Sequence, residues 1–298
     1  MIKHWITAFR LRTLPLAFSC IIMGSALANY YGVFRFTIFI LALLTTLSLQ
    51  ILANLANDYG DTQHGVDDDA RIGPDRVMQQ GLLSTKQMQT AMWIFVGFSS
   101  ICGVSLIIVG VGEKLYSSGL IMAFLGLGAI AAAVKYTMGK NPYGYAGLGD
   151  VFVFLFFGLI GVSGTFYLHG LFLPGQILLP ATTIGLLSVG VLNINNMRDR
   201  EQDKIHGKYT LVVKIGSKNA RIYHIIIIVL SAIILTWFTW EFIIAGYRFF
   251  FFVIYPIILF QSIRIAKTKN DAALDPHLKV LALSTFLLSV LYWISLVL

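Results

Sequence analysis

Apolar runs of about 20 residues recur along this chain, and each is long enough to cross roughly 30 Å of bilayer hydrocarbon as a helix. Only 12% of the 298 residues are charged, about half the share in a typical soluble domain. A soluble fold would therefore have too few polar side chains to cover its surface. Nine runs qualify as spans, at roughly 13–31, 36–56, 91–111, 115–134, 151–169, 177–194, 223–244, 249–265 and 278–297. The sequence predicts an all-α polytopic membrane bundle of about nine transmembrane helices, with residues 1–298 forming a single domain.

The first run resembles a secretory signal, because basic residues precede it and Ala26-Leu27-Ala28 is similar to a cleavage site. The eight later spans insert regardless, so we predict an uncleaved first helix. Cys20 and Cys102 lie in apolar segments, and a disulfide framework or a zinc site needs more thiols at closer spacing. We interpret both cysteines as small core residues.

Basic residues are distributed very unevenly over the predicted loops. If the amino terminus is cytosolic, 19 of the 22 Lys and Arg residues fall on the cytosolic side, and only Arg35, Lys114 and Arg248 fall on the other. This is the bias that sets the orientation of membrane proteins. The net charge of +8 therefore indicates topology and not a nucleic-acid partner. The predicted loops 57–90 and 195–222 are the long cytosolic ones, and long loops in compact proteins are usually functional.

Nine of the 14 acidic residues fall in those two loops, which follow the second and sixth spans. If the helices continue past the membrane, Asn54, Asp58 and Asp61 share one helix face, and Asn195, Asp199 and Asp203 share another. Carboxylates on one face repel each other unless a cation lies between them. Asp68, Asp69, Asp75 and Glu201 are more simply explained as solvated helix ends.

Carboxylate oxygens suit hard divalent cations, and Mg²⁺ is commonly held by one or two carboxylates together with substrate phosphates. Basic residues lie beside both acidic clusters, and they could hold the remaining phosphate oxygens. This combination favours a metal-bridged diphosphate. If an allylic diphosphate ionises, the resulting carbocation needs a dry chamber and can be steadied by aromatic faces, which a membrane bundle supplies.

The motifs resemble those of the UbiA superfamily of intramembrane aromatic prenyltransferases. The resemblance rests on Asn57-Asp58-Tyr-Gly-Asp61 after the second span and on Asp199-x-x-x-Asp203 after the sixth, and it extends to the number of spans. Within the superfamily, the strings Arg71-Ile-Gly-Pro-Asp-Arg76 and Gly207-Lys208-Tyr-Thr-Leu211 are most similar to the branch that acts on 1,4-dihydroxy-2-naphthoate. One departure is that Gly65 occupies the place of a third acid, so that Asp67 is the nearest substitute.

The resemblance implies transfer of an all-trans polyprenyl group from polyprenyl diphosphate to 1,4-dihydroxy-2-naphthoate, with release of diphosphate and CO2, in a bacterial inner membrane. It implies Mg²⁺ as the cofactor, with Asp58, Asp61, Asp199 and Asp203 as catalytic metal ligands, joined by Asp67. The implied substrate-binding residues are Asn54, Asn57, Arg71, Arg76, Tyr136, Lys140, Asn195, Arg198, Lys204 and Lys208. The sequence does not divide the basic residues between the diphosphate and the naphthoate carboxylate.

Two alternatives stay open at this point. The first is the same chemistry on another aromatic acceptor, such as 4-hydroxybenzoate or homogentisate. The second is a membrane transporter, but transporters place ionisable residues near the bilayer midplane, and the middles of the nine predicted spans contain no Asp, Glu, Lys or Arg.

Three further features have simpler explanations. Tyr136 and Lys140 could contact substrate or could form a snorkelling pair at the interface. His64 and His206 are best explained as solvated loop residues. Gly158, Gly161 and Gly164 repeat every three residues in the fifth span, which indicates close packing against another helix.

Overall fold

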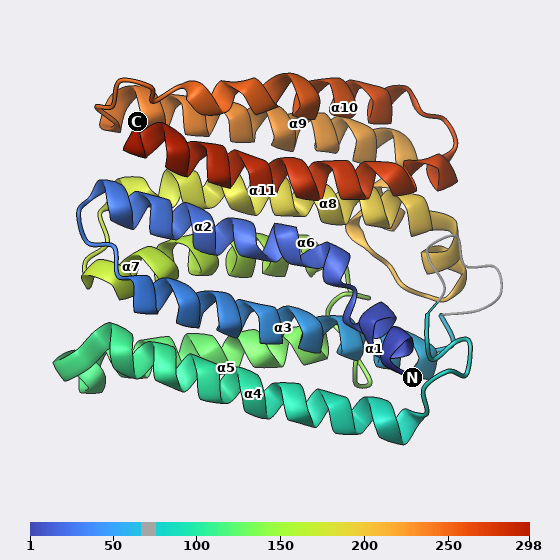
Figure 1. Ribbon diagram of the computed structural model, residues 1–298. Helices are drawn as coiled ribbons and strands as arrows, with labels where there is room; N and C mark the ends of the chain where they lie inside the picture. The colour runs from blue at the N-terminus through green and yellow to red at the C-terminus, as the bar shows by residue number, and fades with distance from the viewer. Residues whose placement is uncertain (67–75) are drawn as a thin grey trace.

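The computed structural model describes residues 1–66 and 76–298, and within these ranges every regular element of secondary structure is a helix. Long helices run side by side along the length of the molecule (Figure 1). The principal elements are α1 (Ile2–Phe9), α2 (Leu14–Tyr30), α3 (Phe36–Gln63), α4 (Thr85–Val111), α5 (Leu120–Lys135), α6 (Gly149–Val153), the π-helical η4 (Phe154–Gly164), α7 (Thr165–Gly170), α8 (Leu178–Ile205), α9 (Leu211–Phe242), α10 (Tyr255–Lys267) and α11 (Asp275–Val297). Short 3₁₀ turns, among them η7 (Asp271–Leu274), join several of them.

Eight helical stretches in the described part of the chain are long and apolar enough to cross a bilayer. One of these stretches, Thr85–Lys135, is 51 residues long and contains both α4 and α5. The chain reverses direction between them at Gly112, whose φ of 52° is a conformation that favours glycine. Each of the nine predicted spans therefore corresponds to a helix or a run of consecutive helices, and the chain is a multi-pass membrane protein.

The predicted edges of the two long loops are wrong. α3 continues to Gln63 and α8 to Ile205, so most of the two acidic motifs lie on helices and not in the predicted loops 57–90 and 195–222. Hydropathy marks where a helix leaves the membrane, whereas the helix itself ends only where a breaker such as Gly65 or Gly207 follows, both at positive φ.

Local hydrogen bonds explain why the next helices begin earlier than hydropathy predicts. Ser84 caps α4 reciprocally with Gln87, with an N–H to Oγ distance of 3.3 Å and an N–H to Oε1 distance of 2.8 Å. The Thr210 hydroxyl accepts from the Val213 N–H at 3.3 Å and begins α9. Gly216, at φ 79° and ψ 163°, then interrupts α9 with a kink.

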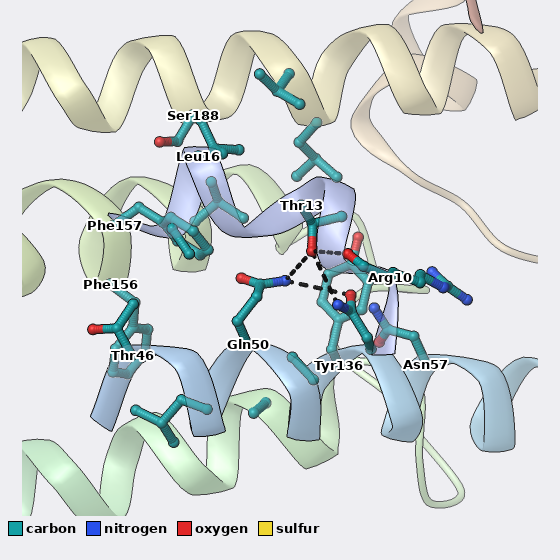
Figure 2. A pocket seen from close by; sticks show the side chains of 18 of the residues that line it. Arg10, Thr13, Leu16, Thr46, Gln50, Asn57, Tyr136, Phe156, Phe157 and Ser188 are labelled. Carbon is teal, nitrogen blue, oxygen red and sulfur yellow. Dashed lines mark hydrogen bonds between the residues drawn. The ribbon is translucent and has the colours of Figure 1, made fainter. Parts of the chain in front are cut away.

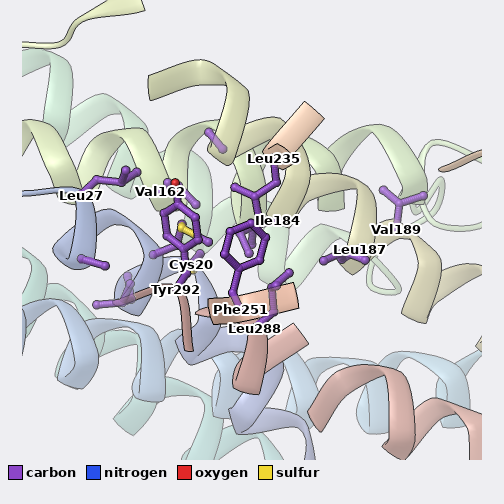
Figure 3. Packing of buried hydrophobic residues seen from close by; sticks show 14 of the residues in the cluster. Cys20, Leu27, Val162, Ile184, Leu187, Val189, Leu235, Phe251, Leu288 and Tyr292 are labelled. Atoms are coloured by element: carbon purple, nitrogen blue, oxygen red, sulfur yellow. The ribbon is translucent and has the colours of Figure 1, made fainter. Parts of the chain in front are cut away.

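The bundle has two outer groups of helices and a central one (Figure 1). α8, α9, α10 and α11 form one group, α3, α4 and α5 form the other, and α2 lies between them with the α6–η4–α7 segment. α2 packs against α3 on one side and against α8 and α11 on the other. The main core lies around α2, α8 and α11, where Cys20, Ile184, Leu288 and Tyr292 are buried (Figure 3).

Small residues set the closest helix approach. An ideal Cβ at Gly158 of η4 would lie 2.7 Å from Gly185 Cα and 2.8 Å from the Ala181 carbonyl oxygen of α8. Only glycine at position 158 permits this backbone contact, as expected for small residues at helix interfaces in membranes. Gly164, on the same π-helical stretch, has no heavy atom within 4 Å of its ideal Cβ among the described residues. The glycine repeat is therefore a packing feature at position 158 but not at position 164.

Candidate active site

A cavity of about 940 Å³ lies between the two outer helix groups and extends from the ends of α3 and α8 into the apolar middle of the bundle. The end of the cavity that carries the two acidic motifs is called the acidic end below. The predicted site residues that line the cavity are Asn54, Asn57, Asp58, Asp61, Arg76, Tyr136, Asn195, Arg198, Asp199, Asp203 and Lys208. Two segments far apart in the sequence therefore meet at one site.

The first motif lies on the last two turns of α3, where Asp58 and Asp61 are only 1% and 2% exposed. The Arg76 guanidinium donates to Asp61 Oδ2 at 2.7 Å, and the Tyr145 hydroxyl donates to Asp61 Oδ1 at 2.8 Å. Arg76 also donates to the Asn57 carbonyl oxygen at 2.7 Å. This bond fastens the start of the second described range, 76–298, to α3. Asp61 is thus held by a buried cation and by a phenol.

The second motif lies on the last turns of α8. Arg198 donates to both oxygens of Asp199, from Nε and from Nη2, each at 2.7 Å. Asp203 is 2% exposed, and its Oδ1 lies 3.4 Å from Lys208 Nζ. Gly207, at φ +71°, ends the helix and lets the Lys208 N–H return to the Asp203 carbonyl oxygen at 2.7 Å. The helix end therefore folds the lysine over the carboxylate.

Lys208 links the two motifs electrostatically. Burial alone lowers the pKa of its ammonium group, but the carboxylates of Asp61 and Asp203 outweigh burial and raise the pKa above its ordinary value. The ammonium nitrogen also lies 5.5 Å from the centre of the Tyr145 ring. Lys208 is therefore a permanently charged, buried cation that faces carboxylates from both α3 and α8.

Phenols at the acidic end stay protonated. Burial raises the pKa of Tyr136 to about 12. Burial and then the charge of Asp61 raise the pKa of Tyr145 as well. Next to Tyr136, the Tyr143 and Phe152 rings stack with their centres 4.0 Å apart. The Phe156 ring continues the row, with its centre 6.2 Å from that of Phe152. The wall next to the charged groups is thus aromatic.

Uncharged polar groups complete the cavity on the side of α2 (Figure 2). The Gln50 and Asn54 amides donate to the Thr13 hydroxyl at 3.2 and 3.0 Å, and Asn54 also donates to the Phe9 carbonyl oxygen at 2.9 Å. Arg10 lines the same corner and has a φ of 47°, which is uncommon for a residue other than glycine. Asn54 therefore joins α3 to the amino-terminal segment.

The structure does not place every predicted residue at the cavity. Lys140 and Lys204 are exposed and do not line it, so the structure gives no support to their predicted contacts with substrate. Asp67 and Arg71 lie outside the described residues. His64 and His206 bond back to carbonyl oxygens of their own helix ends, at 2.8 and 2.9 Å.

Several cavity residues were missed by the sequence interpretation. Gln50 is an uncharged polar residue inside a predicted span, and its polarity is a weaker signal there than a charge. Asp275 is a single acid at the start of the last span, on the same predicted side of the membrane as the motifs. Arg10 and Arg12 precede the first span, where basic residues are expected from topology alone.

The carboxylates suit a magnesium ion that is also bound by phosphate oxygens better than one held by protein side chains alone. Among residues 1–66 and 76–298, no three Asp, Glu, His or Cys side chains gather closely enough to hold a metal ion. In the same ranges, no donor reaches the buried Asp203 Oδ2. Since Mg²⁺ usually takes one or two carboxylates and fills its shell with water and phosphate oxygens, Asp58, Asp61, Asp199 and Asp203 form a suitable donor set.

The fold and the cavity define an intramembrane helical bundle with an acidic binding site at one end of an apolar chamber. The sequence model of the UbiA prenyltransferase family matches residues 17–295, and the chain belongs to that family.

Relatives and solved structures agree with this assignment. A 1,4-dihydroxy-2-naphthoate octaprenyltransferase of Haemophilus influenzae is 40% identical over 99% of this chain and 96% of its own length. The Escherichia coli protein of the same description is 40% identical over 93% of this chain and 89% of its own length. The fold matches a UbiA homologue from Archaeoglobus fulgidus, solved with DMAPP and Mg²⁺, with a TM-score of 0.59 at 17% identity over 95% and 98% of the two chains.

Proposed function

We propose that this chain transfers a polyprenyl group from polyprenyl diphosphate to 1,4-dihydroxy-2-naphthoate and releases diphosphate and CO2, the step that gives demethylmenaquinol. The observation that carries the proposal is the cavity, in which carboxylates of α3 and α8 face the buried cations Arg76 and Lys208 at the end of an apolar chamber. The acceptor is supported by the relatives at 40% identity, which are described as 1,4-dihydroxy-2-naphthoate octaprenyltransferases.

In this proposal the acidic end binds the diphosphate headgroup. Asp58, Asp61, Asp199 and Asp203 would hold Mg²⁺, and Asn57 and Asn195 would orient these carboxylates or contact the metal through water. When bound, Mg²⁺ stabilises the negative charge that grows on the departing diphosphate. Asp67 and Arg71 retain their predicted roles as a further metal ligand and a phosphate contact.

The basic side chains have two tasks. Before substrate binds, Arg76, Arg198 and Lys208 neutralise buried carboxylates that would otherwise repel one another. When the diphosphate binds, the same cations lie next to its oxygens and offset its charge, which is where fixed charges act most strongly. All three cations are placed for this second task, because all three are buried and line the cavity.

The chamber below the headgroup protects the reactive allyl cation from water. The row of Tyr143, Phe152 and Phe156 presents aromatic rings beside the acidic end, and ring faces attract a cation. Further along, residues such as Leu106, Met122 and Leu168 line the cavity and suit an isoprenoid tail. The electron-rich dihydroxynaphthoate ring then attacks the cation and loses its carboxylate as CO2.

We propose the same orientation as the charge bias predicts, with the acidic end at the cytosolic face of a bacterial inner membrane. The observation in support is that 19 of 22 basic residues fall on the side of the two acidic motifs. Residues 1–298 then act as one transmembrane prenyltransferase domain.

Purified full-length protein tests this function directly. Incubation with 1,4-dihydroxy-2-naphthoate, polyprenyl diphosphates of several lengths and Mg²⁺ is expected to give the prenylated, decarboxylated ring, identified by mass. Asp61→Asn and Asp203→Asn are each expected to lower kcat/KM by about 100-fold or more, as for the loss of one preorganised group that stabilises charge. Chelation of divalent metal should stop the reaction, and added Mg²⁺ should restore it.

A matched control lies on the same helix end. Glu201 is 62% exposed and pairs with Arg200 on the surface, so Glu201→Gln should leave turnover within about twofold of the parent, as is usual for a surface pair. Near-parental activity in both aspartate variants would contradict metal-assisted ionisation. Turnover of 4-hydroxybenzoate or homogentisate with none of dihydroxynaphthoate would contradict the acceptor.

A further inference from the structure

Asp275, in the first turn of α11, shares a buried guanidinium with the second acidic motif. Arg198 is 3% exposed and donates from Nη1 to Asp275 Oδ1, while its Nε and Nη2 donate to Asp199. Nη2 also donates to Asn195 Oδ1 at 2.9 Å. One cation is therefore bracketed by two carboxylates and an amide from two helices that are distant in the sequence. Asp275 itself lines the cavity.

Both oxygens of Asp199 are engaged by Arg198 in this arrangement, each at 2.7 Å. Each oxygen keeps a second lone pair, but a metal ion on Asp199 would lie beside the Arg198 cation and be repelled by it, so metal binding is favoured when this two-point contact loosens. An Arg198 released by Asp199 and lacking any other carboxylate would be a buried, unpaired cation, which is strongly unfavourable. Asp275 binds a different nitrogen of the guanidinium, so Arg198 keeps an ionic partner when it turns away from Asp199.

The charges lead to the same conclusion. Asp199, Asp275 and Arg198 together carry a net charge of −1, whereas Asp199 and Arg198 alone would be neutral. Asp275 adds one negative charge beside the Arg198–Asp199 pair, and an added negative charge favours a divalent cation at this place. Asp275 therefore favours exchange of the guanidinium for a metal ion in two ways.

We propose that Asp275 is a positioning residue: it holds Arg198 so that Asp199 can exchange its guanidinium partner for a divalent metal ion. The inference rests on the proposed function, since it assumes that Asp199 is a metal ligand. It assigns α11 a role in assembling the metal site, although α11 carries neither acidic motif.

A second acid in the preceding turn provides a matched control. Asp271 of η7 pairs with Arg221 at 2.6 Å and with Arg200 at 3.3 Å. It also accepts from the Ser217 hydroxyl at 3.2 Å and does not line the cavity. Asp271 therefore fastens the same turn to α8 and α9 by ion pairs, but these pairs involve Arg200 and Arg221 and not Arg198.

The experiment measures metal binding without prenyl donor or acceptor. Full-length protein with inorganic diphosphate is titrated with Mn²⁺, a cation that takes the same oxygen ligands, and free Mn²⁺ is followed by electron paramagnetic resonance. Asp275→Asn is expected to raise the half-saturating Mn²⁺ concentration about tenfold, as loss of an outer partner of a metal ligand does. Asp275→Glu should return it to within about threefold of the parent value. The half-saturating Mg²⁺ concentration in prenyl transfer should shift in parallel.

Asp271→Asn should lower the melting temperature but leave the half-saturating Mn²⁺ concentration within about threefold of the parent value. A shift of less than about threefold in Asp275→Asn, or an equal shift in Asp271→Asn, overturns the proposal. If Asp275→Asn does not fold, Asp275→Ser replaces it, because serine keeps an oxygen in the first helical turn. Failure of the parent protein to prenylate dihydroxynaphthoate would refute the proposed function, while the Mn²⁺ titration would still test Asp275.

Discussion

Gly158 allows a direct test of how closely η4 and α8 must pack. A methyl group at this position would lie 2.7 Å from Gly185 Cα and 2.8 Å from the Ala181 carbonyl oxygen. Ordinary contacts of such atoms begin near 3.5 Å, so α8 must retreat by about 1 Å to accept Gly158→Ala. Both contacts involve backbone atoms, which cannot turn aside as a side chain can.

Insertion of an extra carbon into a well-packed interior costs about 1–3 kcal/mol. Because both neighbours are backbone atoms, the upper part of this range, about 2–3 kcal/mol, applies. Alanine recovers about 1 kcal/mol of helix propensity relative to glycine, which leaves a net loss of about 1–2 kcal/mol. For a chain of 298 residues, with an unfolding entropy of about 0.6 kcal/mol/K, the melting temperature should fall by about 2–3 °C. The rate of prenyl transfer should also fall. α8 carries Asp199 and Asp203, and a displacement of about 1 Å at a reacting group can lower the rate about 100-fold.

The assay is thermal unfolding of the purified protein in detergent, followed by tryptophan fluorescence, with prenyl transfer measured on the same preparation. Gly164→Ala is the control, since it lies on the same helical stretch and its ideal Cβ meets no heavy atom within 4 Å in the described residues. It should melt at or slightly above the parent temperature. A Gly158→Ala variant as stable as the parent would show that the two helices are not in backbone contact.

Two further predictions address the ends of the cavity. Tyr145→Phe removes the hydroxyl that donates to Asp61 at 2.8 Å, and loss of a hydrogen bond to a charged group should lower kcat/KM about 10- to 100-fold. Because the pKa of Tyr145 is raised above its ordinary value, the phenol stays protonated, and the defect should be the same at every pH from about 6.5 to 9; a defect that disappears at high pH would contradict this. Gly126→Leu places a side chain in open cavity space and should lower the rate with long polyprenyl diphosphates relative to geranyl diphosphate. Gly97→Leu, at an exposed position of α4, should leave that ratio unchanged. Equal ratios in both variants would exclude the apolar part of the cavity as the site of the tail.

The helices were predictable because hydropathy is a local property of the chain. Nine runs of about 20 apolar residues are enough to predict the spans, since only helices satisfy their backbone groups within lipid. The acidic faces were also predictable, because Asp58 and Asp61 recur at helical spacing. The sequence does not show how far these helices continue beyond the membrane. Polar residues such as Asp203 end the hydrophobic run, but the helix continues through them.

The remaining parts of the site depend on which helices are neighbours. Asp275 becomes significant only when α11 is seen beside α8, and no spacing rule connects position 275 with position 198. Gln50 is similar, because its amide matters only once Thr13 of the amino-terminal segment lies across from it. The ion pair of Asp61 with Arg76 is easier to anticipate, since both residues fall within the predicted loop 57–90.

The two acidic motifs belong to different outer groups of helices, and α2 and η4 fill the space between those groups. The separation of the carboxylates is therefore a property of the whole bundle's cross-section and not of any one helix. A detergent that loosens the packing of α2 against its neighbours would increase the distance between the two motifs while each helix stayed intact. Circular dichroism would then report a native protein that no longer turns over, and enzyme preparations are better judged by metal binding than by helical content.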